Sequence, residues 1–236
     1  MVFCYFCSPL LAIIYWNMSD QHDSFASLTN SYDVAITASR WWAKLYLRII
    51  WGIDYSDIAR QLIALLPEPL VGSLLEVPIG TAIFTAPFYR DNPQVRIVGV
   101  DYSSQMLAIA HQRLQALAVP NVALAQADVA SLPFADGSFD CIISMNGMQC
   151  FPDKEQALKE MSRVLRPGGL FVSSFYIRGQ RLVADWIAHG PLQRKGVFFG
   201  PHWTLQQATD RLEQRVGPIN YLVRQKSIVL VACTRR

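Results

Sequence analysis

The sequence predicts an α/β fold built on a mostly parallel β-sheet with helices on both faces. Two observations lead to this prediction: short apolar runs alternate with longer amphipathic ones after Pro69, and the acidic residues Glu76, Asp101 and Asp128 each follow one of the short runs. Strands that alternate with helices form βαβ units, whose strands are parallel. Right-handed crossovers bring ligand sites to the carboxyl ends of such strands, so we expect the functional site there.

The individual elements follow from the spacing of the apolar residues. An apolar face that repeats about every 3.6 residues indicates a helix, and a short apolar run bounded by turn residues indicates a strand. The turn Asp136-Gly137 precedes one strand, and an Arg-Pro-Gly-Gly run ends one helix. We expect strands at residues 73–77, 96–100, 122–126, 139–145, 170–175 and 227–233, and helices at residues 81–89, 104–117, 154–165 and 204–216.

A separate helical segment precedes this alternating region. Between residues 31 and 66 apolar side chains recur at near-helical spacing, Ser56 with Asp57 is a candidate cap of the second helix, and Pro67 ends it. The expected organisation is a leader at residues 1–18 and a single domain at 19–236, in which a helical cap at 19–69 precedes a core at 70–236 with an insertion at 178–203.

Composition limits the possible partners. The chain is 52% hydrophobic and 17% charged, which favours a large buried core over disorder. The net charge is only +3 and no Lys/Arg-rich run is present, so we expect no nucleic-acid partner. The five cysteines are odd in number and widely spaced, which argues against a disulfide framework, and we expect no metal site.

Residues 2–16 are apolar and aromatic, with no positively charged flank, and the stretch is too short to span a bilayer. Three interpretations stay open: a weak signal or membrane anchor, an ordered hydrophobic strap on the domain, or upstream sequence read from the wrong start codon. Met18 opens a stretch typical of an ordinary N-terminus, so we favour the last interpretation. We accordingly expect a cytoplasmic protein without stable membrane insertion.

The turn after the first strand reads Leu-Leu-Glu-Val-Pro-Ile-Gly-Thr-Ala. Such a turn brings backbone N–H groups and a helix N-terminus close to a polar ligand. The Glu76 carboxylate at the strand tip can fix the loop or receive a cationic amino group. A plain strand-to-turn junction with a partly exposed glutamate explains the same residues, so this motif alone is weak.

Two further carboxylates follow the next strands. Asp101 stands about 20 residues beyond the first loop, where a carboxylate can accept both hydroxyls of a ribose. It can equally cap the helix that starts near Ser104. Asp128 follows the third strand and can accept a hydrogen bond from an exocyclic amine such as that of adenine. Its simpler interpretation is an Asx-turn in a loop.

These blocks together resemble one family. Glu76 with Gly80, then Asp101, Asp128, the run Pro-Phe-Ala-Asp-Gly-Ser-Phe-Asp and the run Arg-Val-Leu-Arg-Pro-Gly-Gly appear in the order found in class I S-adenosylmethionine (SAM) dependent methyltransferases. The similarity is greatest to the small-molecule, ubiquinone/menaquinone methyltransferase-like branch, and it covers residues 70–233. Each block alone is unspecific, but their order and spacing together are specific.

The resemblance implies a Rossmann-like, seven-stranded, mostly parallel sheet with an antiparallel last strand. It implies SAM as the cofactor and S-adenosylhomocysteine as its product. It also assigns roles to residues at the strand ends: Glu76, Pro78 and Gly80 for the methionine end, Asp101 for the ribose, Tyr102 and Met106 beside the adenine, Asp128 and Val129 at its edge, and Met145 and Asn146 on the methyl-transfer side.

The sequence departs from the family pattern at two positions of the first loop. Pro78 lacks the backbone N–H that a glycine would supply there. Ala82 keeps its N–H but adds a methyl group where helix and strand pack. These departures put in doubt how the loop holds the methionine end, and they leave the other motifs intact.

Aromatic residues outside these motifs are candidates for a pocket that holds the methyl acceptor. Tyr32, Trp41 and Trp42 from the cap, with Trp203 from the insertion, would suit an apolar or aromatic molecule and keep water out. Core packing explains each of them equally simply. His189 and His202 are candidate general bases, because neutral imidazole accepts a proton near physiological pH, although a structural or exposed role is simpler.

The sequence therefore predicts transfer of a methyl group from SAM to a small, apolar or aromatic metabolite. The alternative is a SAM-binding relative that does not methylate, either a cyclase or isomerase or a binding module. A nicotinamide-dependent oxidoreductase also carries an acidic residue after its second strand, but Glu76 and Asp128 point away from it.

Overall fold

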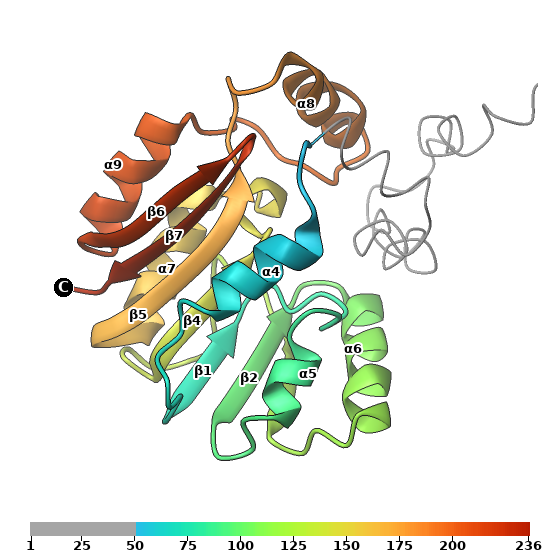
Figure 1. Cartoon of the computed structure of the whole chain (residues 1–236), viewed down its shortest axis with the longest axis vertical. Coiled ribbons are helices and arrows are strands. Elements are labelled where there is room, and N and C mark those ends of the chain that lie inside the picture. Colours follow the sequence, from blue (N-terminus) through green and yellow to red (C-terminus); the bar gives the residue numbers. More distant parts are fainter. Residues whose placement is uncertain (1–50) are drawn as a thin grey trace, which may run out of the picture.

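The computed structural model describes residues 51–236, and one continuous sheet runs through this part of the chain (Figure 1). The leader and the cap residues Tyr32, Trp41 and Trp42 lie outside the described residues. The sheet has seven strands in the order β3-β2-β1-β4-β5-β7-β6. Their bounds are β1 Ser73–Glu76, β2 Arg96–Asp101, β3 Val122–Gln126, β4 Phe139–Met145, β5 Leu165–Tyr176, β6 Ile219–Gln225 and β7 Ile228–Thr234.

Strands β1 to β5 are parallel, and β7 runs antiparallel to both β5 and β6. This arrangement confirms the predicted mostly parallel sheet with an antiparallel last strand. Glu76 at the end of β1 lies beside Gly99 of β2 and Ile143 of β4. The carboxyl ends of the three central strands therefore meet at one edge, as the predicted site requires.

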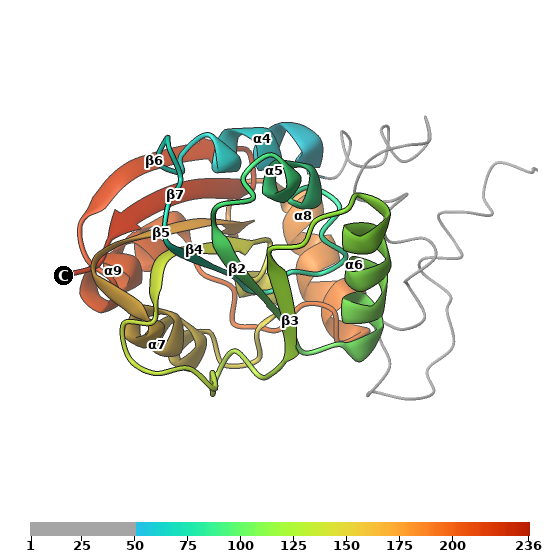
Figure 2. The same ribbon diagram turned by 90° about the horizontal axis from the view of Figure 1, so that it is seen from below.

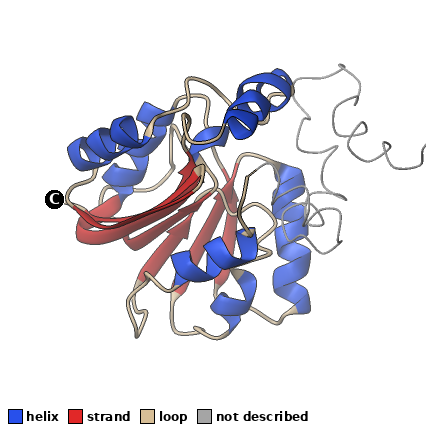
Figure 3. Ribbon diagram, turned by 45° about the horizontal axis from the view of Figure 1, so that its top comes forward, coloured by secondary structure: helices blue, strands red, loops and turns tan. Residues whose placement is uncertain are grey.

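Helices cover both faces of the sheet (Figure 3). Helices α7 and α9 pack on one face, and α4, α5 and α6 pack on the other (Figure 2). The short helices α8 and η3 lie in the insertion, and η2 follows β4. The bounds are α4 Tyr55–Ile63, α5 Ala86–Arg90, α6 Ser104–Ala116, η2 Met148–Cys150, α7 Lys154–Val164, α8 Leu182–Ile187, η3 Ala188–Leu192 and α9 Leu205–Arg215.

The alternation of side chains between the two faces of each strand explains how two cores form. Leu74 and Leu75 are both fully buried, yet Leu74 packs under α4 to α6 and Leu75 packs under α7 and α9. Successive side chains of a strand point to opposite faces, so a sheet covered on both faces needs apolar residues at every position. The continuous apolar run of β1 is therefore the sequence counterpart of a doubly covered sheet.

Two helix starts differ from the prediction. Helix α5 begins at Ala86 instead of residue 81, because the chain first forms turns in which Ala82 takes a φ of 54°. A residue in this left-handed region cannot continue a right-handed helix. Helix α4 is capped by Asp54, whose Oδ1 accepts from the Ser56 N–H at 2.8 Å, so Ser56 with Asp57 is not the cap.

The residue pattern does not predict strand β6, which the structure contains. It forms the edge of the sheet, pairs with β7 and exposes part of most of its side chains. An edge strand needs no strongly apolar run, so its signal is weak. The insertion also contains helices that the pattern does not predict, and β5 starts at Leu165, with an irregular register that absorbs the residues before Leu170.

No helix in the described part of the chain combines the length and the apolar character needed to cross a bilayer. The described cysteines Cys141, Cys150 and Cys233 are free thiols. Within residues 51–236 no cluster of His, Cys, Asp and Glu side chains has the arrangement of a metal site.

Candidate active site

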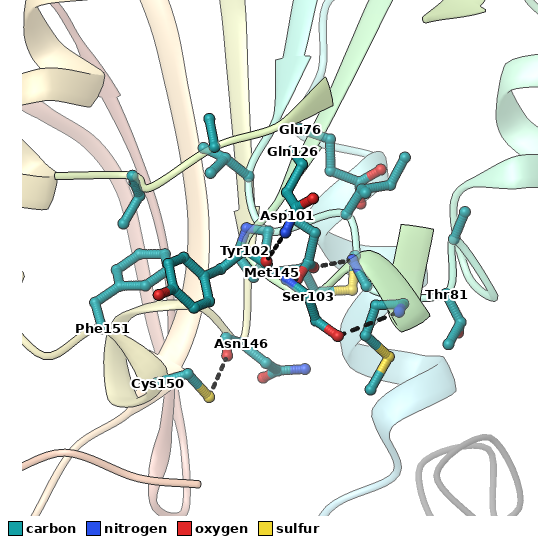
Figure 4. A pocket seen from close by; sticks show the side chains of 18 of the residues that line it. Glu76, Thr81, Asp101, Tyr102, Ser103, Gln126, Met145, Asn146, Cys150 and Phe151 are labelled. Atoms are coloured by element: carbon teal, nitrogen blue, oxygen red, sulfur yellow. Dashed lines mark hydrogen bonds between the residues drawn. The ribbon is translucent and has the colours of Figure 1, made fainter. Parts of the chain in front are cut away.

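A cavity of about 650 Å³ opens at the carboxyl edge of β1, β2 and β4 (Figure 4). Small-molecule sites in proteins usually measure about 300–1,000 Å³, so this cavity has room for a cofactor together with a small acceptor. Its walls come from the loop after β1, the ends of β2, β3 and β4, the start of α6, the segment after η2, and two residues of the insertion.

The loop after β1 is held in place by hydrogen bonds to its neighbours. The Val77 N–H donates to the Ile143 carbonyl at 2.9 Å and the Ile79 N–H to the Val100 carbonyl at 2.8 Å. Gly80 takes a φ of 55°, a conformation that favours glycine. Pro78, where the sequence departs from the family pattern, packs closely against Gly147. A Cβ added to Gly147 would lie 2.5 Å from the Pro78 Cδ.

Asp101 links the second strand to this loop. Its Oδ2 accepts from the Gly80 N–H at 2.8 Å and its Oδ1 from the Ser103 N–H at 2.9 Å. Burial raises the pKa of the Asp101 carboxyl, and these backbone donors lower it. An ionised carboxylate offers about four acceptor positions, so both oxygens keep capacity for ribose hydroxyls. The cap of α6 is Ser103, whose hydroxyl accepts from the Met106 N–H.

Glu76 lies at the inner end of the cavity and is only 3% exposed. The Thr85 hydroxyl at 2.9 Å and the Tyr89 hydroxyl at 2.7 Å both donate to its Oε2. Burial raises the pKa of Glu76 to about 8; the two hydroxyl donors lower it, and Asp101 raises it further. The carboxyl group is therefore largely protonated at neutral pH in the ligand-free protein.

The structure brings all the residues assigned to the cofactor to this one cavity. Asp128 makes the expected Asx-turn, since its Oδ1 accepts from the Ala130 N–H at 2.8 Å. Asn146 takes a φ of 54°, and its side-chain Oδ1 is buried without a hydrogen-bond partner. The assigned residues that line the cavity are Glu76, Pro78, Gly80, Asp101, Tyr102, Met106, Asp128, Val129, Met145 and Asn146.

Part of the cavity wall is apolar. Ile83 and Phe84 line the cavity from the β1–α5 loop, and two segments further along the chain contribute a second set of lining residues. We name this second set the acceptor-side wall; it consists of Cys150, Phe151, Pro152, Gly196 and Phe199. The sequence pattern does not indicate Phe151, and it indicates Phe199 only as one of the aromatic residues of the insertion. Their signals are slight: a Cys-Phe-Pro run after β4 and one aromatic among several in the insertion.

Trp203 does not line the cavity, so its expected place in the acceptor pocket is corrected. The side chain is 5% exposed and belongs to the core under α7 and α9. Its ring meets Phe175 edge to face at 6.2 Å, and the Arg211 guanidinium lies 5.3 Å over it. Trp203 packs toward the sheet because burial of its large ring against Phe175 and its core neighbours is favourable.

Neither candidate histidine faces the cavity. His202 is 3% exposed and packs against the rings of Tyr176 and His189. Burial lowers the pKa of His202 to about 4, with further lowering by Lys154 and His189. His189 is exposed and is not among the residues of the cavity wall. A general base must reach the proton that it removes, so this placement does not support either role.

Residues 74–169, which run from β1 into β5, match the model of a family described as methyltransferase domain. The demethylmenaquinone methyltransferase of Bacillus cereus is 31% identical over 154 residues, which are 63% of this chain and 58% of that protein. The ubiquinone/menaquinone biosynthesis C-methyltransferase of Pasteurella multocida is 40% identical over 98 residues, 41% of this chain and 37% of that protein. Residues 74–169 therefore form a methyltransferase domain.

The methyltransferase domain also has the fold of solved relatives. A SAM-dependent methyltransferase of Thermotoga maritima, described as a possible histamine N-methyltransferase, superposes with a TM-score of 0.64 at 18% identity. The alignment covers 90% of this chain and 98% of that one. At this identity the likeness concerns the fold alone. The chain spans 37% and 58% of the lengths of the two curated relatives, so the match to them is partial.

The residues of the methyltransferase domain fit SAM. SAM carries two cationic groups, its sulfonium and its amino group, and one carboxylate, and the acidic side chains on the described cavity wall are those of Glu76, Asp101 and Asp128. The buried, unpaired Oδ1 of Asn146 provides an acceptor that a polar ligand can satisfy. The features at Pro78 and Ala82 leave the loop well packed and do not remove the cavity.

Proposed function

We propose that the protein transfers the methyl group of SAM to a small, uncharged, apolar or aromatic metabolite. One observation carries the proposal: a single cavity is lined both by polar groups, those of Glu76, Asp101 and Asn146, and by the apolar side chains of Phe84 and the acceptor-side wall. SAM supplies an already activated methyl group when it is bound. The protein then needs only to align the two reactants and exclude water.

Each end of the cavity has a distinct part in this proposal. Asp101 holds the ribose hydroxyls with the acceptor positions that Gly80 and Ser103 leave free. Glu76 and Asn146 receive the amino group at the methionine end. Phe84, together with Phe151 and Phe199, holds the acceptor against the sulfonium and keeps water out.

The charge of the cavity disfavours an anionic acceptor. The described residues of its wall include acidic groups but no Lys, Arg or His. A phosphorylated or carboxylated acceptor would meet like charges with no compensating cation, which costs binding energy at short range. An apolar acceptor instead gains from the aromatic wall. The names of the two curated relatives, which concern quinone biosynthesis, are compatible with such an acceptor.

The cap residues extend the proposal beyond the described part of the chain. We propose that Tyr32, Trp41 and Trp42 complete the acceptor pocket in place of Trp203. We propose further that the protein acts in the cytoplasm and has no nucleic-acid partner, since the sequence lacks a Lys/Arg-rich run. Cell fractionation tests the location.

The direct test uses SAM labelled in its methyl group and a metabolite extract as the acceptor pool. We expect label in a small compound that partitions into organic solvent, and little label when Asp101→Ala replaces the wild type. Tight binding of SAM without any transfer, across extracts from several growth conditions, would instead identify a non-methylating relative. Failure to bind SAM at all would refute both interpretations.

A further inference from the structure

Lys154 is a buried cation without a carboxylate partner. It is the first residue of α7 and is 6% exposed. Its Nζ donates to two main-chain carbonyls, those of Phe151 and Phe199, and no acidic side chain in residues 51–236 forms an ion pair with it. Buried ammonium groups are costly and are usually paired with a carboxylate. This arrangement therefore calls for a function other than stability.

The two carbonyls belong to the two segments of the acceptor-side wall. Phe151 follows η2, and Phe199 lies in the insertion, far along the chain. The Phe199 N–H donates to the Gln149 carbonyl at 2.8 Å, so the main chain of Phe199 is held on both sides. Gln149 is itself fixed, because its Oε1 accepts from the Tyr176 N–H at 3.2 Å. Lys154 thus joins two separate segments into one wall.

The environment of Lys154 disfavours its charged form. Burial lowers the pKa of Lys154 to about 8, while Cys150 and Asp153 raise it only in part. His202, whose pKa Lys154 helps to lower, is the other titratable group nearby. An apolar side chain of similar length would avoid the desolvation of the ammonium group, so stability alone does not explain a lysine here. Perturbed groups of this kind concentrate at functional sites.

We infer that Lys154 is a positioning residue that sets the shape of the acceptor-side wall by holding the carbonyls of Phe151 and Phe199 together. The inference rests on the proposed function, because this wall is where the acceptor lies. Lys154 does not line the cavity itself, so it acts through the two phenylalanines. An ammonium group donates stronger hydrogen bonds than a neutral amine, so the wall loosens as Lys154 loses its proton above pH 8.

Hydrogen exchange tests the inference without an acceptor. The amide of Phe199 reports on the wall, because it exchanges only when its bond to Gln149 opens. In Lys154→Met we expect exchange of the peptide that contains Phe199 to be faster by about tenfold or more, the equivalent of one lost charge-assisted bond. Lys154→Arg, which keeps the charge and the donors, should restore much of the protection. Lys159→Met is the matched control, since Lys159 is exposed on the same helix.

The wild-type protein provides a second readout that needs no variant. After correction for intrinsic exchange, protection at Phe199 should fall between pH 7 and pH 9 more steeply than protection in β1 and β4, which reports the titration of Glu76. A lysine that only stabilised the domain as a whole would instead lower protection equally at Phe199 and in the strands. In Lys154→Met the additional pH dependence at Phe199 should disappear, because the titrating amine is gone.

A methyl-transfer assay distinguishes an effect on the acceptor-side wall from an effect on the cofactor site. With labelled SAM and a metabolite extract as the acceptor pool, transfer at limiting extract should fall about tenfold in Lys154→Met and recover as more extract is added. Affinity for S-adenosylhomocysteine should stay within about twofold of wild type, because the hydrogen bonds of Lys154 go to Phe151 and Phe199 and not to residues assigned to the cofactor.

The outcomes are distinguishable. Unchanged exchange at Phe199 in Lys154→Met overturns the inference, as does an equal loss of protection throughout the sheet or an equal loss of S-adenosylhomocysteine affinity. If Lys154→Met does not fold, the pH dependence of the wild type decides, and a flat profile at Phe199 overturns the inference. A wild type that binds S-adenosylhomocysteine but transfers no label refutes the proposed function, and the exchange measurements still decide the role of Lys154.

Discussion

The carboxylate of Asp101 accepts a hydrogen bond from the backbone N–H of Gly80 at 2.8 Å. This bond joins the tips of two adjacent strands, so the residue proposed to hold the ribose also shapes the loop proposed to hold the methionine end. The two roles are compatible because each carboxylate oxygen has more than one acceptor position. Substitution of Asp101 therefore affects both the ligand-free protein and ligand binding.

Asp101→Ala should weaken SAM binding by about 2–3 kcal/mol, through lost bonds to the ribose. It should also lower the free energy of unfolding by about 1–3 kcal/mol, because the N–H groups of Gly80 and Ser103 lose their acceptor. Calorimetry and urea denaturation measure the two effects. Asp210→Ala is the control, since Asp210 is exposed on α9 and is not among the residues of the cavity wall. Unchanged SAM affinity in folded Asp101→Ala would contradict the ribose assignment.

Binding of SAM should release a proton from Glu76. The pKa of Glu76 is raised to about 8 in the ligand-free protein, and a nearby cationic amino group favours the ionised form. Affinity should therefore rise with pH by up to about tenfold per unit below pH 8 and level off above it. Calorimetry in buffers of different ionisation enthalpy counts the proton.

Glu76→Gln should abolish the proton release, whereas Glu155→Gln, a control on α7, should keep it. Glu76 also affects stability in the opposite sense to most carboxylates. Because the pKa of Glu76 in the folded protein lies above the ordinary glutamate value of 4.5, its contribution to stability is present below pH 4.5 and is lost as pH rises to about 8. The free energy of unfolding of Glu76→Gln should be less dependent on pH in this window. Equal proton release in both variants would show that another group titrates.

Trp203 and Phe199 should respond differently to truncation. Trp203→Ala removes a buried ring from the core under α7 and α9 and should cost about 3–5 kcal/mol of stability, with SAM affinity of the folded protein unchanged. Phe199→Ala removes part of the acceptor-side wall and should reduce methyl transfer more than stability. Urea denaturation and the labelled-SAM assay compare the two. A stable Trp203→Ala protein with impaired methyl transfer would support the original assignment of Trp203 to the acceptor pocket.

A chain that starts at Met18 should remain monodisperse and bind SAM as tightly as the full chain. The expectation follows from the absence of targeting flanks around residues 2–16, which lie outside the described part of the structure. Size-exclusion chromatography and calorimetry on both chains are sufficient. Aggregation or loss of SAM binding would show instead that these residues form part of the domain.

The sheet and the cofactor end of the cavity could be predicted from the sequence because both depend on local patterns. The apolar run before Glu76, the run before Asp101 and the turn at Asp136-Gly137 each specify their element within a few residues. Parallel strands then bring their carboxyl ends to one edge whatever the details of packing. The assigned cofactor residues accordingly meet in a single cavity.

The acceptor end of the cavity depended on tertiary structure. His202 and Trp203 are the candidates of this segment in the sequence, yet the nearby Phe199 is the residue that lines the cavity. Which way each side chain turns depends on partners far along the chain, such as Phe175 beneath Trp203. Burial of an aromatic ring gains free energy against any apolar partner, so composition alone cannot distinguish a pocket wall from a core. Local pattern thus determined the strands and their polar ends, and only long-range packing decided the wall that faces the acceptor.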